Sequence, residues 1–223
     1  MRAMSAHESS IFIDNARRRR ILLGIVESYY QGEPADVVCF DMNRGWCGVL
    51  PAVVELLPTS RVVCCVRSPA WILDSIERLV QLNPLVLSKL FDYDSSTVYN
   101  RVEALATTTL LAPALNGLRQ AWFSDYADRL VVVRYDSLVE QPRRVVEQLY
   151  ALLDERPFEH DFEGVEYDEK DFDALLGLPG LHRASGAVRP RPRATVLPAD
   201  LFRLYDREFW SEEGGNPRGV TIL

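Results

Sequence analysis

Lysine and cysteine are scarce in this sequence, and each shortage excludes a class of protein. Only two of the 25 basic residues are lysines, and acidic residues outnumber basic ones to give a net charge of −7. Nucleic-acid-binding proteins usually carry a basic excess, so we expect no nucleic-acid partner. The four cysteines are too few for a disulfide framework and include no Cys-x-x-Cys pair of the kind that binds zinc, so no metal is predicted.

Long apolar runs are also missing. No stretch approaches the ~20 residues that a membrane-spanning helix needs, and the N-terminus has no apolar signal core. We therefore predict a cytoplasmic protein without a membrane span. Residues 1–10 are mostly polar and are expected to be mobile.

What the sequence does contain is a repeated alternation of short apolar strands and helices. Continuous apolar runs predict buried strands, and apolar residues at helical spacing predict helices between them. The strands are expected at residues 36–40, 61–66 and 130–133, and the helices at 11–30, 45–57, 69–82, 97–126, 142–153 and 200–210. This order indicates an α/β fold with a parallel sheet flanked by helices. We expect residues 1–223 to form a single domain.

An arginine stands at the end of each predicted strand. Arg67 and Arg134 directly follow two of the strands, and Arg44 comes shortly after the other. Carboxyl ends of parallel strands meet at one edge of a sheet, where ligands bind. Guanidinium groups there, next to helix N-termini, would form an anion-binding site. The alternative is that each arginine pairs with a nearby carboxylate such as Asp41 or Asp136.

Two segments around these arginines resemble the nucleotide-binding signatures of PAPS-dependent sulfotransferases. In CVRSPAWILDSIERL, Arg67 ends a strand and Ser75 follows eight residues later, as in the family's 3′-phosphate-binding signature. VVVRYDSLVEQPRRVVEQLYALLD is similar to the family's segment in which a tyrosine–acid–leucine turn precedes a helix begun by proline. FDMNRGW looks like the strand end near the family's sulfuryl-transfer centre. The likeness is to the bacterial branch of the family and runs from residue 11 to the C-terminus.

This resemblance implies a P-loop NTPase-like fold, with PAPS or its product 3′,5′-ADP as the cofactor and no metal. Arg67 and Ser75 would hold the 3′-phosphate, and Tyr135 would approach the adenine. The irregular segment 178–198, rich in Gly, Pro and Arg, would lie over the nucleotide site. Its arginines are the candidates for the late basic loop with which the family closes over the 3′-phosphate: Arg183, Arg189, Arg191 and Arg193.

The resemblance also locates the reacting centre. Arg44 occupies the place where many sulfotransferases carry the histidine that takes the proton of the acceptor hydroxyl. A guanidinium cannot act as a base near neutral pH, although it can stabilise the transferred group. His160 and His182 could serve as the base instead. We take Arg44 and His182 as the candidate catalytic residues.

One part of the family's pattern is missing from this sequence. Sulfotransferases begin with a strand, a Gly/Ser-rich loop and a helix, and the backbone N–H groups of the loop hold the 5′-phosphosulfate. No such loop stands before residue 36. We therefore expect an N-terminally truncated sulfotransferase, which would be inactive in this form and an enzyme only if the loop exists upstream.

Three functions remain open on these observations. The first is transfer of a sulfuryl group from PAPS to a hydroxyl or amine of a small-molecule acceptor. The second is a non-catalytic role in binding 3′,5′-ADP or a partner, and the third is a P-loop kinase-like activity. The stretch 82–126 is expected to wall the acceptor pocket, with Tyr99, Trp122 and Phe123 as lining residues.

Overall fold

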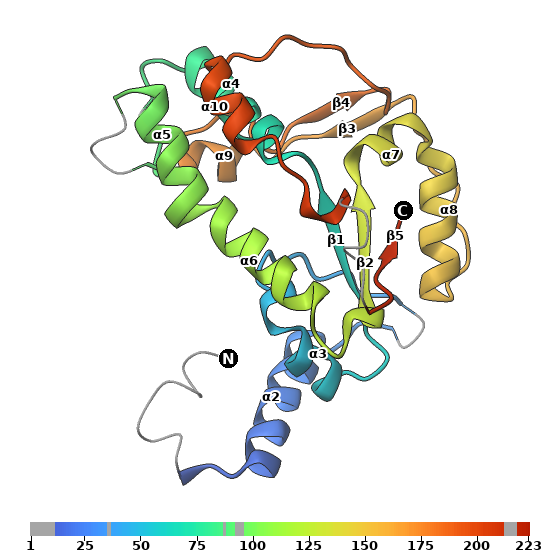
Figure 1. The fold of residues 1–223 in the computed structure, drawn as a ribbon. Helices are drawn as coiled ribbons and strands as arrows, with labels where there is room; N and C mark the ends of the chain where they lie inside the picture. The colour runs from blue at the N-terminus through green and yellow to red at the C-terminus, as the bar shows by residue number, and fades with distance from the viewer. Residues whose placement is uncertain (1–11, 35–36, 87, 92–95, 212–217) are drawn as a thin grey trace.

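Short parallel strands form the centre of the structure, and helices pack on both faces of them (Figure 1). The computed structural model describes residues 12–34, 37–86, 88–91, 96–211 and 218–223, so the segment 1–10 that we expect to be mobile lies outside it. The α-helices are α2 (Asn15–Tyr29), α3 (Leu50–Leu56), α4 (Pro69–Leu82), α5 (Val98–Ala104), α6 (Leu111–Trp122), α7 (Tyr135–Glu140), α8 (Pro142–Leu153), α9 (Lys170–Leu176) and α10 (Ala199–Tyr205).

The main sheet has the strand order β1-β2-β5 and is parallel throughout, as the sequence predicts. It consists of β1 (Val62–Val66), β2 (Leu130–Arg134) and β5 (Thr221–Ile222). The register pairs Val66 with Arg134. Because β1 and β2 end at the same level, the residues that follow them, Arg67 and Tyr135, begin side by side.

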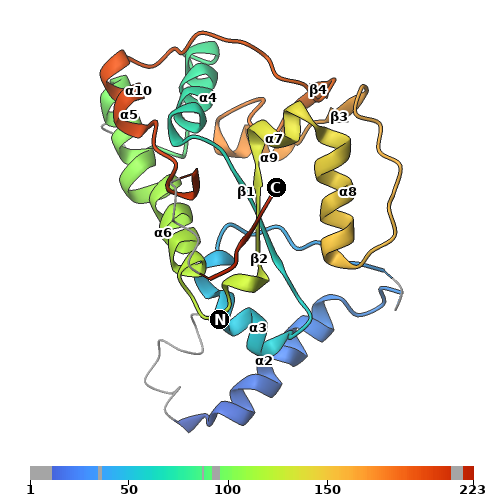
Figure 2. The ribbon, with the colours of Figure 1, turned by 45° about the vertical axis from the view of Figure 1, so that its right-hand side comes forward.

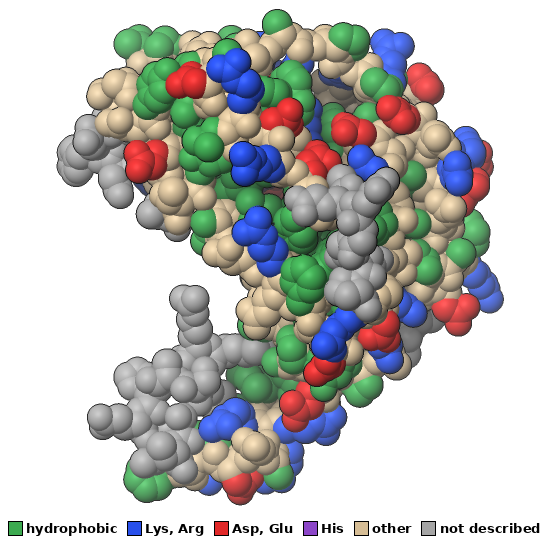
Figure 3. Space-filling view, viewed as in Figure 1, with side chains coloured by type: hydrophobic (Ala, Val, Ile, Leu, Met, Phe, Trp, Pro, Cys, Tyr) green, Lys and Arg blue, Asp and Glu red, His purple; other side chains and the backbone are tan. Residues whose placement is uncertain are grey.

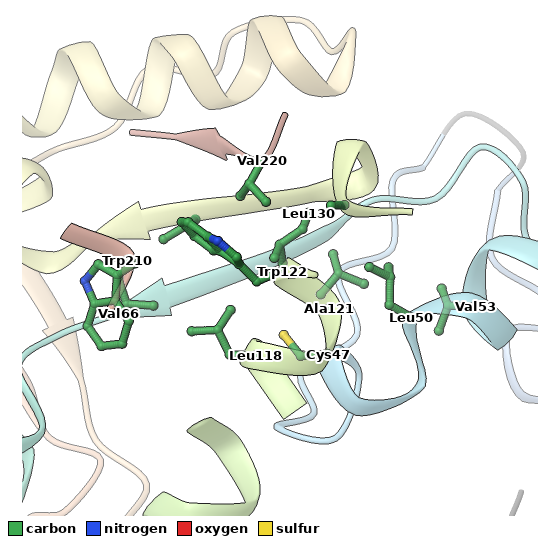
Figure 4. Packing of buried hydrophobic residues seen from close by; sticks show 13 residues of the cluster. Cys47, Leu50, Val53, Val66, Leu118, Ala121, Trp122, Leu130, Trp210 and Val220 are labelled. Atoms are coloured by element: carbon green, nitrogen blue, oxygen red, sulfur yellow. The ribbon is translucent and has the colours of Figure 1, made fainter. Parts of the chain in front are cut away.

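The two faces of this sheet are covered by different helices, and Figures 1 and 2 show α6 and α8 on opposite sides of it. Val131 and Val133 pack against Val145 of α8. The alternate residues of β1 and β2 face α6 and α3, where Trp122 and Leu50 lie in one cluster (Figure 4). Burial on both faces accounts for the continuous apolar runs of the two strands.

A second cluster surrounds α4. Leu73 and Ile76 pack with Leu201 of α10 and with Leu178, which follows α9. The chain after Leu178 forms a two-stranded antiparallel sheet with an earlier segment, pairing β3 (Val165–Tyr167) with β4 (Ala184–Gly186). From β4 it crosses over α4 to reach α10 (Figure 2). The irregular segment 178–198 is therefore anchored beside α4 by apolar residues before and after it.

The predicted strand at 36–40 is wrong for residues 37–40, which form no regular structure. Val37, Val38 and Phe40 are exposed, and none of them belongs to a hydrophobic cluster. A parallel strand gains its stability from burial on both faces, and these side chains lack that burial.

Other elements are confirmed or corrected at their ends. The helices opened by Pro69 and Pro142 have the predicted bounds, and Asp14 caps α2 by accepting a hydrogen bond from the Arg17 backbone N–H at 2.7 Å. The predicted helix 97–126 is divided into α5, a π-helical turn at Leu105–Thr109, and α6. α7, α9, β5 and the strands β3 and β4 were not predicted, because each is too short to give a periodic signal.

Candidate functional site

Arg67 and Tyr135 form the centre of the candidate site. The guanidinium carbon of Arg67 lies 4.1 Å from the centroid of the Tyr135 ring and 6.0 Å from that of the Trp71 ring. The Nε atom of Arg67 is buried and has no hydrogen-bond partner among the described residues. A guanidinium that is stacked on aromatic rings and has an unsatisfied N–H is suited to receive an anion.

The alternative was that the strand-end arginines pair with nearby carboxylates such as Asp41. The contacts of Asp41 do not support this alternative. Its two carboxylate oxygens accept hydrogen bonds from the Tyr30 hydroxyl at 2.7 Å and from the Trp46 indole at 2.9 Å. The hydrogen bond to Asp41, with smaller contributions from burial and nearby charge, raises the pKa of Tyr30 to about 12. Asp41 therefore orients the turn that follows it.

Ser75 lies one helical turn after Trp71 in α4, and its hydroxyl donates to the Trp71 carbonyl at 2.9 Å. Arg193 reaches this pair from the irregular segment. Its Nη2 atom donates to the Ser75 hydroxyl at 2.8 Å and contacts the Trp71 carbonyl at 3.3 Å. The Arg193 guanidinium also lies 5.1 Å from the Trp71 ring centroid. Trp71 thus has the guanidinium groups of Arg67 and Arg193 near its ring.

These groups concentrate positive charge beside α4. Burial lowers the pKa of Arg193; the charges of Arg67 and Arg78 lower it further, while Asp74 opposes them. Arg193 stays charged at neutral pH, as arginines in proteins do. The cluster that forms is thus Arg67, Arg78 and Arg193, rather than the three strand-end arginines. Arg134, the last residue of β2, uses its backbone N–H to bond the Leu223 carbonyl at 2.9 Å.

The other arginines of the segment 178–198 have different surroundings. Arg191 donates to the Ser185 and Ala187 carbonyls at 3.0 and 3.4 Å, so it braces its own loop. Arg183 lines a separate pocket of about 270 Å³ with Asp168 and Lys170. Arg189 is exposed. No described contact brings these three arginines to Ser75.

His182 forms a close pair with Asp173 of α9. Its Nδ1 atom lies 2.6 Å from Asp173 Oδ1, and its backbone N–H donates to the other carboxylate oxygen at 2.9 Å. Burial would raise the pKa of Asp173, but the hydrogen bonds and charge of His182 hold it below its usual value. The side chain of Asp173 is fully buried and that of His182 is 42% exposed. A base oriented by a buried carboxylate is an arrangement that removes protons in enzymes.

The structure does not bring His182 to the arginine cluster by any described contact. Gly180, two residues before it, packs against Leu79 near the end of α4. Leu79 directly follows Arg78 in α4. The pair and the cluster therefore both border α4, although no described side-chain contact joins them.

Arg44 is exposed in the turn that leads to α3. The side chain of Asn43 accepts the Gly45 backbone N–H at 2.8 Å and shapes this turn. Cys47, just beyond it, lies in the hydrophobic cluster against which Cys64 of β1 packs. The turn that carries Arg44 therefore leads to a residue packed near the middle of β1, two residues before the strand ends at Val66.

The residues expected to line an acceptor pocket are separated by the fold. Trp122 is 1% exposed in the core, so this part of the expectation is wrong. Phe123 is exposed, and the Tyr99 hydroxyl donates to the Asp200 carboxylate at 3.2 Å. His160 bonds the Tyr150 hydroxyl at 3.0 Å and lines a shallow pocket of about 880 Å³ beside the start of α8.

Trp71 is a site residue that the sequence alone did not single out. The signal was present, because Trp71 stands at i−4 from Ser75 and must share its face of the helix. Asp74 could be seen in the sequence as a polar residue next to Ser75, but its role could not be predicted there, since Thr195 and Val196, to which it bonds, are more than 100 positions away.

Membrane spans and metal clusters are both absent from the described part of the chain. It contains no helix long and apolar enough to cross a membrane. It also contains no group of three His, Cys, Asp or Glu side chains placed to hold a metal ion. On the face in Figure 3, the described Lys and Arg side chains are scattered among acidic and apolar ones.

Comparison with known protein families identifies a match over most of the chain. The model of the sulfotransferase family matches residues 3–160, which include Arg44, Arg67, Ser75 and Tyr135. Arg193 and His182 lie beyond the matched range. No curated protein and no solved structure matches the chain.

Proposed function

Since the chain belongs to the sulfotransferase family, we propose that it is the nucleotide-binding part of an enzyme that transfers a sulfuryl group from PAPS to a hydroxyl or amine of a small-molecule acceptor. The observation that carries this proposal is the convergence of Arg67, Ser75 and Arg193 from three segments of the chain. The buried, unpartnered Nε atom of Arg67 fits a ligand oxygen there.

In this proposal each group has a role set by its chemistry. Arg67 and Arg193 neutralise the 3′-phosphate that distinguishes PAPS from ATP, since guanidinium groups match phosphate oxygens. Ser75 offers its hydroxyl to the same phosphate, and Tyr135 supports the base of the nucleotide. Bound PAPS would supply the activated sulfuryl group.

Arg193 is our choice for the basic loop, ahead of Arg183, Arg189 and Arg191. All four remain within the segment proposed to lie over the nucleotide. Only the Arg193 side chain contacts Ser75 in the described contacts. Its neighbour Arg191 bonds carbonyls of its own segment instead.

For the chemical step, we assign Arg44 to the sulfuryl group and His182 to the acceptor proton. Asp173 would hold the imidazole so that Nε2 accepts a proton and the imidazolium that results is stabilised. In a protein that also carries the family's loop for the 5′-phosphosulfate, replacing His182 with Asn should lower kcat by about 100-fold while leaving the affinity for 3′,5′-ADP unchanged. His160→Asn is the matched control, and an equal loss in both variants would remove His182 from this role.

We further propose that, in the full-length protein, a Gly/Ser-rich loop for the 5′-phosphosulfate stands upstream of residue 1. The 223 residues contain no such loop before residue 36. Within the described residues, β1 pairs with β2 alone and stands at the edge of the sheet, and its Cys65 side chain is exposed. An unpaired edge of a parallel strand is a place where a further strand adds stability.

The intact mass of the protein from its source tests this last point. A mass well above 25.4 kDa with a Gly/Ser-rich loop in the added sequence supports the full transferase. A mass of 25.4 kDa supports the alternative of a non-catalytic 3′,5′-ADP-binding protein, which the intact arginine cluster favours.

Calorimetry tests the nucleotide site directly. We expect 3′,5′-ADP to bind this chain at least about tenfold more tightly than ADP, because ADP lacks the 3′-phosphate that two arginines would contact. Equal affinities would contradict the proposal. Tighter binding of ATP than of 3′,5′-ADP would favour a kinase-like protein.

A further inference from the structure

Asp74 is a buried carboxylate of α4 to which the proposed chemistry gives no role. It is 0% exposed and directly precedes Ser75 in the helix. A carboxylate is rarely buried unless it is paired and hydrogen-bonded, because removing a charge from water is unfavourable. Its partners therefore indicate what Asp74 does.

The two oxygens of Asp74 hold different parts of the irregular segment. Oδ1 accepts the Thr195 hydroxyl at 2.9 Å and the Val196 backbone N–H at 2.6 Å. Oδ2 faces two guanidinium groups, with Nη2 of Arg193 at 3.2 Å and Nη2 of Arg78 at 3.5 Å. One oxygen thus fixes the path of the chain, and the other fixes the side chain of Arg193.

These contacts make the segment around Arg193 part of the α4 surface. Arg78 adds a hydrogen bond to the Ala194 carbonyl at 2.8 Å. The result is that Arg193 Nη2 is held where it donates to the Ser75 hydroxyl. Without Asp74, Arg193 would repel Arg67 and Arg78 with no opposite charge to hold it in place.

We propose that Asp74 is a positioning residue that latches Arg193 onto Ser75 and so prepares the site for the 3′-phosphate, an inference that rests on the proposed function for the identity of the ligand. We call these contacts of Asp74 the latch. Because the latch orders the segment around Arg193 before the nucleotide binds, less conformational entropy is lost on binding. It also explains why Arg193, and not a neighbouring arginine, reaches Ser75.

The rate of trypsin cleavage measures how firmly the latch holds the segment around Arg193, and this measurement needs no ligand. Trypsin cuts after arginine but not before proline, so the bonds after Arg189 and Arg191 are resistant and the Arg193–Ala194 bond is sensitive. Cleavage requires local opening of the segment. The Arg183–Ala184 bond lies in the same segment outside the latch and is the internal control.

Asp74→Ala should speed cleavage at Arg193 by about tenfold relative to cleavage at Arg183, because it removes every contact of the carboxylate. Asp74→Asn keeps an oxygen for the Val196 N–H and should give a smaller increase. Thr195→Val leaves the buried charge intact, so it tests the latch even if Asp74→Ala fails to fold. An unchanged cleavage ratio in the folded variants would overturn the proposal.

Nucleotide binding then separates positioning from simple support of the fold. In Asp74→Asn, the affinity for 3′,5′-ADP should fall by about tenfold while the affinity for ADP stays the same. An equal loss for both nucleotides would show that Asp74 only stabilises the fold and would overturn the positioning role. If the wild type does not prefer 3′,5′-ADP over ADP, the proposed function is wrong, and so is the role of Asp74 in preparing a phosphate site. The cleavage ratio would still decide whether the latch exists.

Discussion

The guanidinium group of Arg67 stacks on the ring of Tyr135, 4.1 Å from its centroid, because the two strands that precede these residues are in register. This places a cation at the carboxyl edge of the sheet with an aromatic face beneath it. The stacking holds the guanidinium without neutralising it, unlike a salt bridge with a carboxylate. Arg67 therefore keeps its full charge for a ligand.

Replacing Arg67 with Gln should weaken binding of 3′,5′-ADP by about 10- to 100-fold, because a charge-assisted hydrogen bond to phosphate is lost. Arg61→Gln is the matched control. Arg61 stands at the other end of the same strand and bonds the Asp128 carbonyl. Isothermal titration of both variants with 3′,5′-ADP measures the difference, and a comparable loss in Arg61→Gln would indicate a general effect of net charge.

The Tyr135 ring should matter more than its hydroxyl. Tyr135→Phe preserves the face on which Arg67 stacks and should leave the affinity for 3′,5′-ADP within about twofold, whereas Tyr135→Ala should lower it by about fivefold or more. The same titrations apply. A large loss in Tyr135→Phe would instead assign the role to a hydrogen bond from the hydroxyl.

The features of this fold that depend on residues close together in the sequence could be predicted, and those that depend on distant residues could not. β1, β2, α4 and α8 were predicted within one residue, because their apolar patterns and opening prolines are local signals. The segment 37–40 has the same kind of apolar pattern and failed, because whether a strand forms depends on partners elsewhere in the chain.

The candidate site divides in the same way. Arg67, Ser75 and Tyr135 could be found in the sequence, since they stand at strand ends and at fixed helical spacing. The choice of Arg193 among four arginines could not be made there, because it depends on a contact across 118 positions of the chain. The role of Asp74 could not be predicted for the same reason, since its hydrogen bonds to Thr195 and Val196 span similar numbers of positions.

The Asp173–His182 pair should make the stability of the protein depend on pH. Because the pKa of Asp173 is lower in the folded protein than its usual value of about 3.9, the ionised form stabilises the fold. This contribution is fully present above that value and is lost as the pH falls through the lower, folded pKa. Urea unfolding at a series of pH values from neutral to acidic should show it.

Asp173→Asn should flatten this pH dependence, since the amide does not titrate. Asp171→Asn is its control, because Asp171 lies in the same helix and is exposed. If both variants keep the acid-induced loss of the wild type, other carboxylates must be responsible for it.

The close approach of Gly48 and Gly117 gives a test of how the Arg44 turn is seated. A Cβ atom at Gly117 of α6 would lie 3.1 Å from the Gly48 backbone nitrogen, so Gly117→Ala must push the turn away from the helix. Overpacking of this kind reduces the free energy of unfolding by about 1–3 kcal/mol. Gly24 of α2 has no atom within 4 Å of such a Cβ, so Gly24→Ala should instead add about 0.5–1 kcal/mol through helix propensity. Urea denaturation of both variants measures the two shifts, and a stabilising Gly117→Ala would mean that the turn carrying Arg44 is not packed on α6.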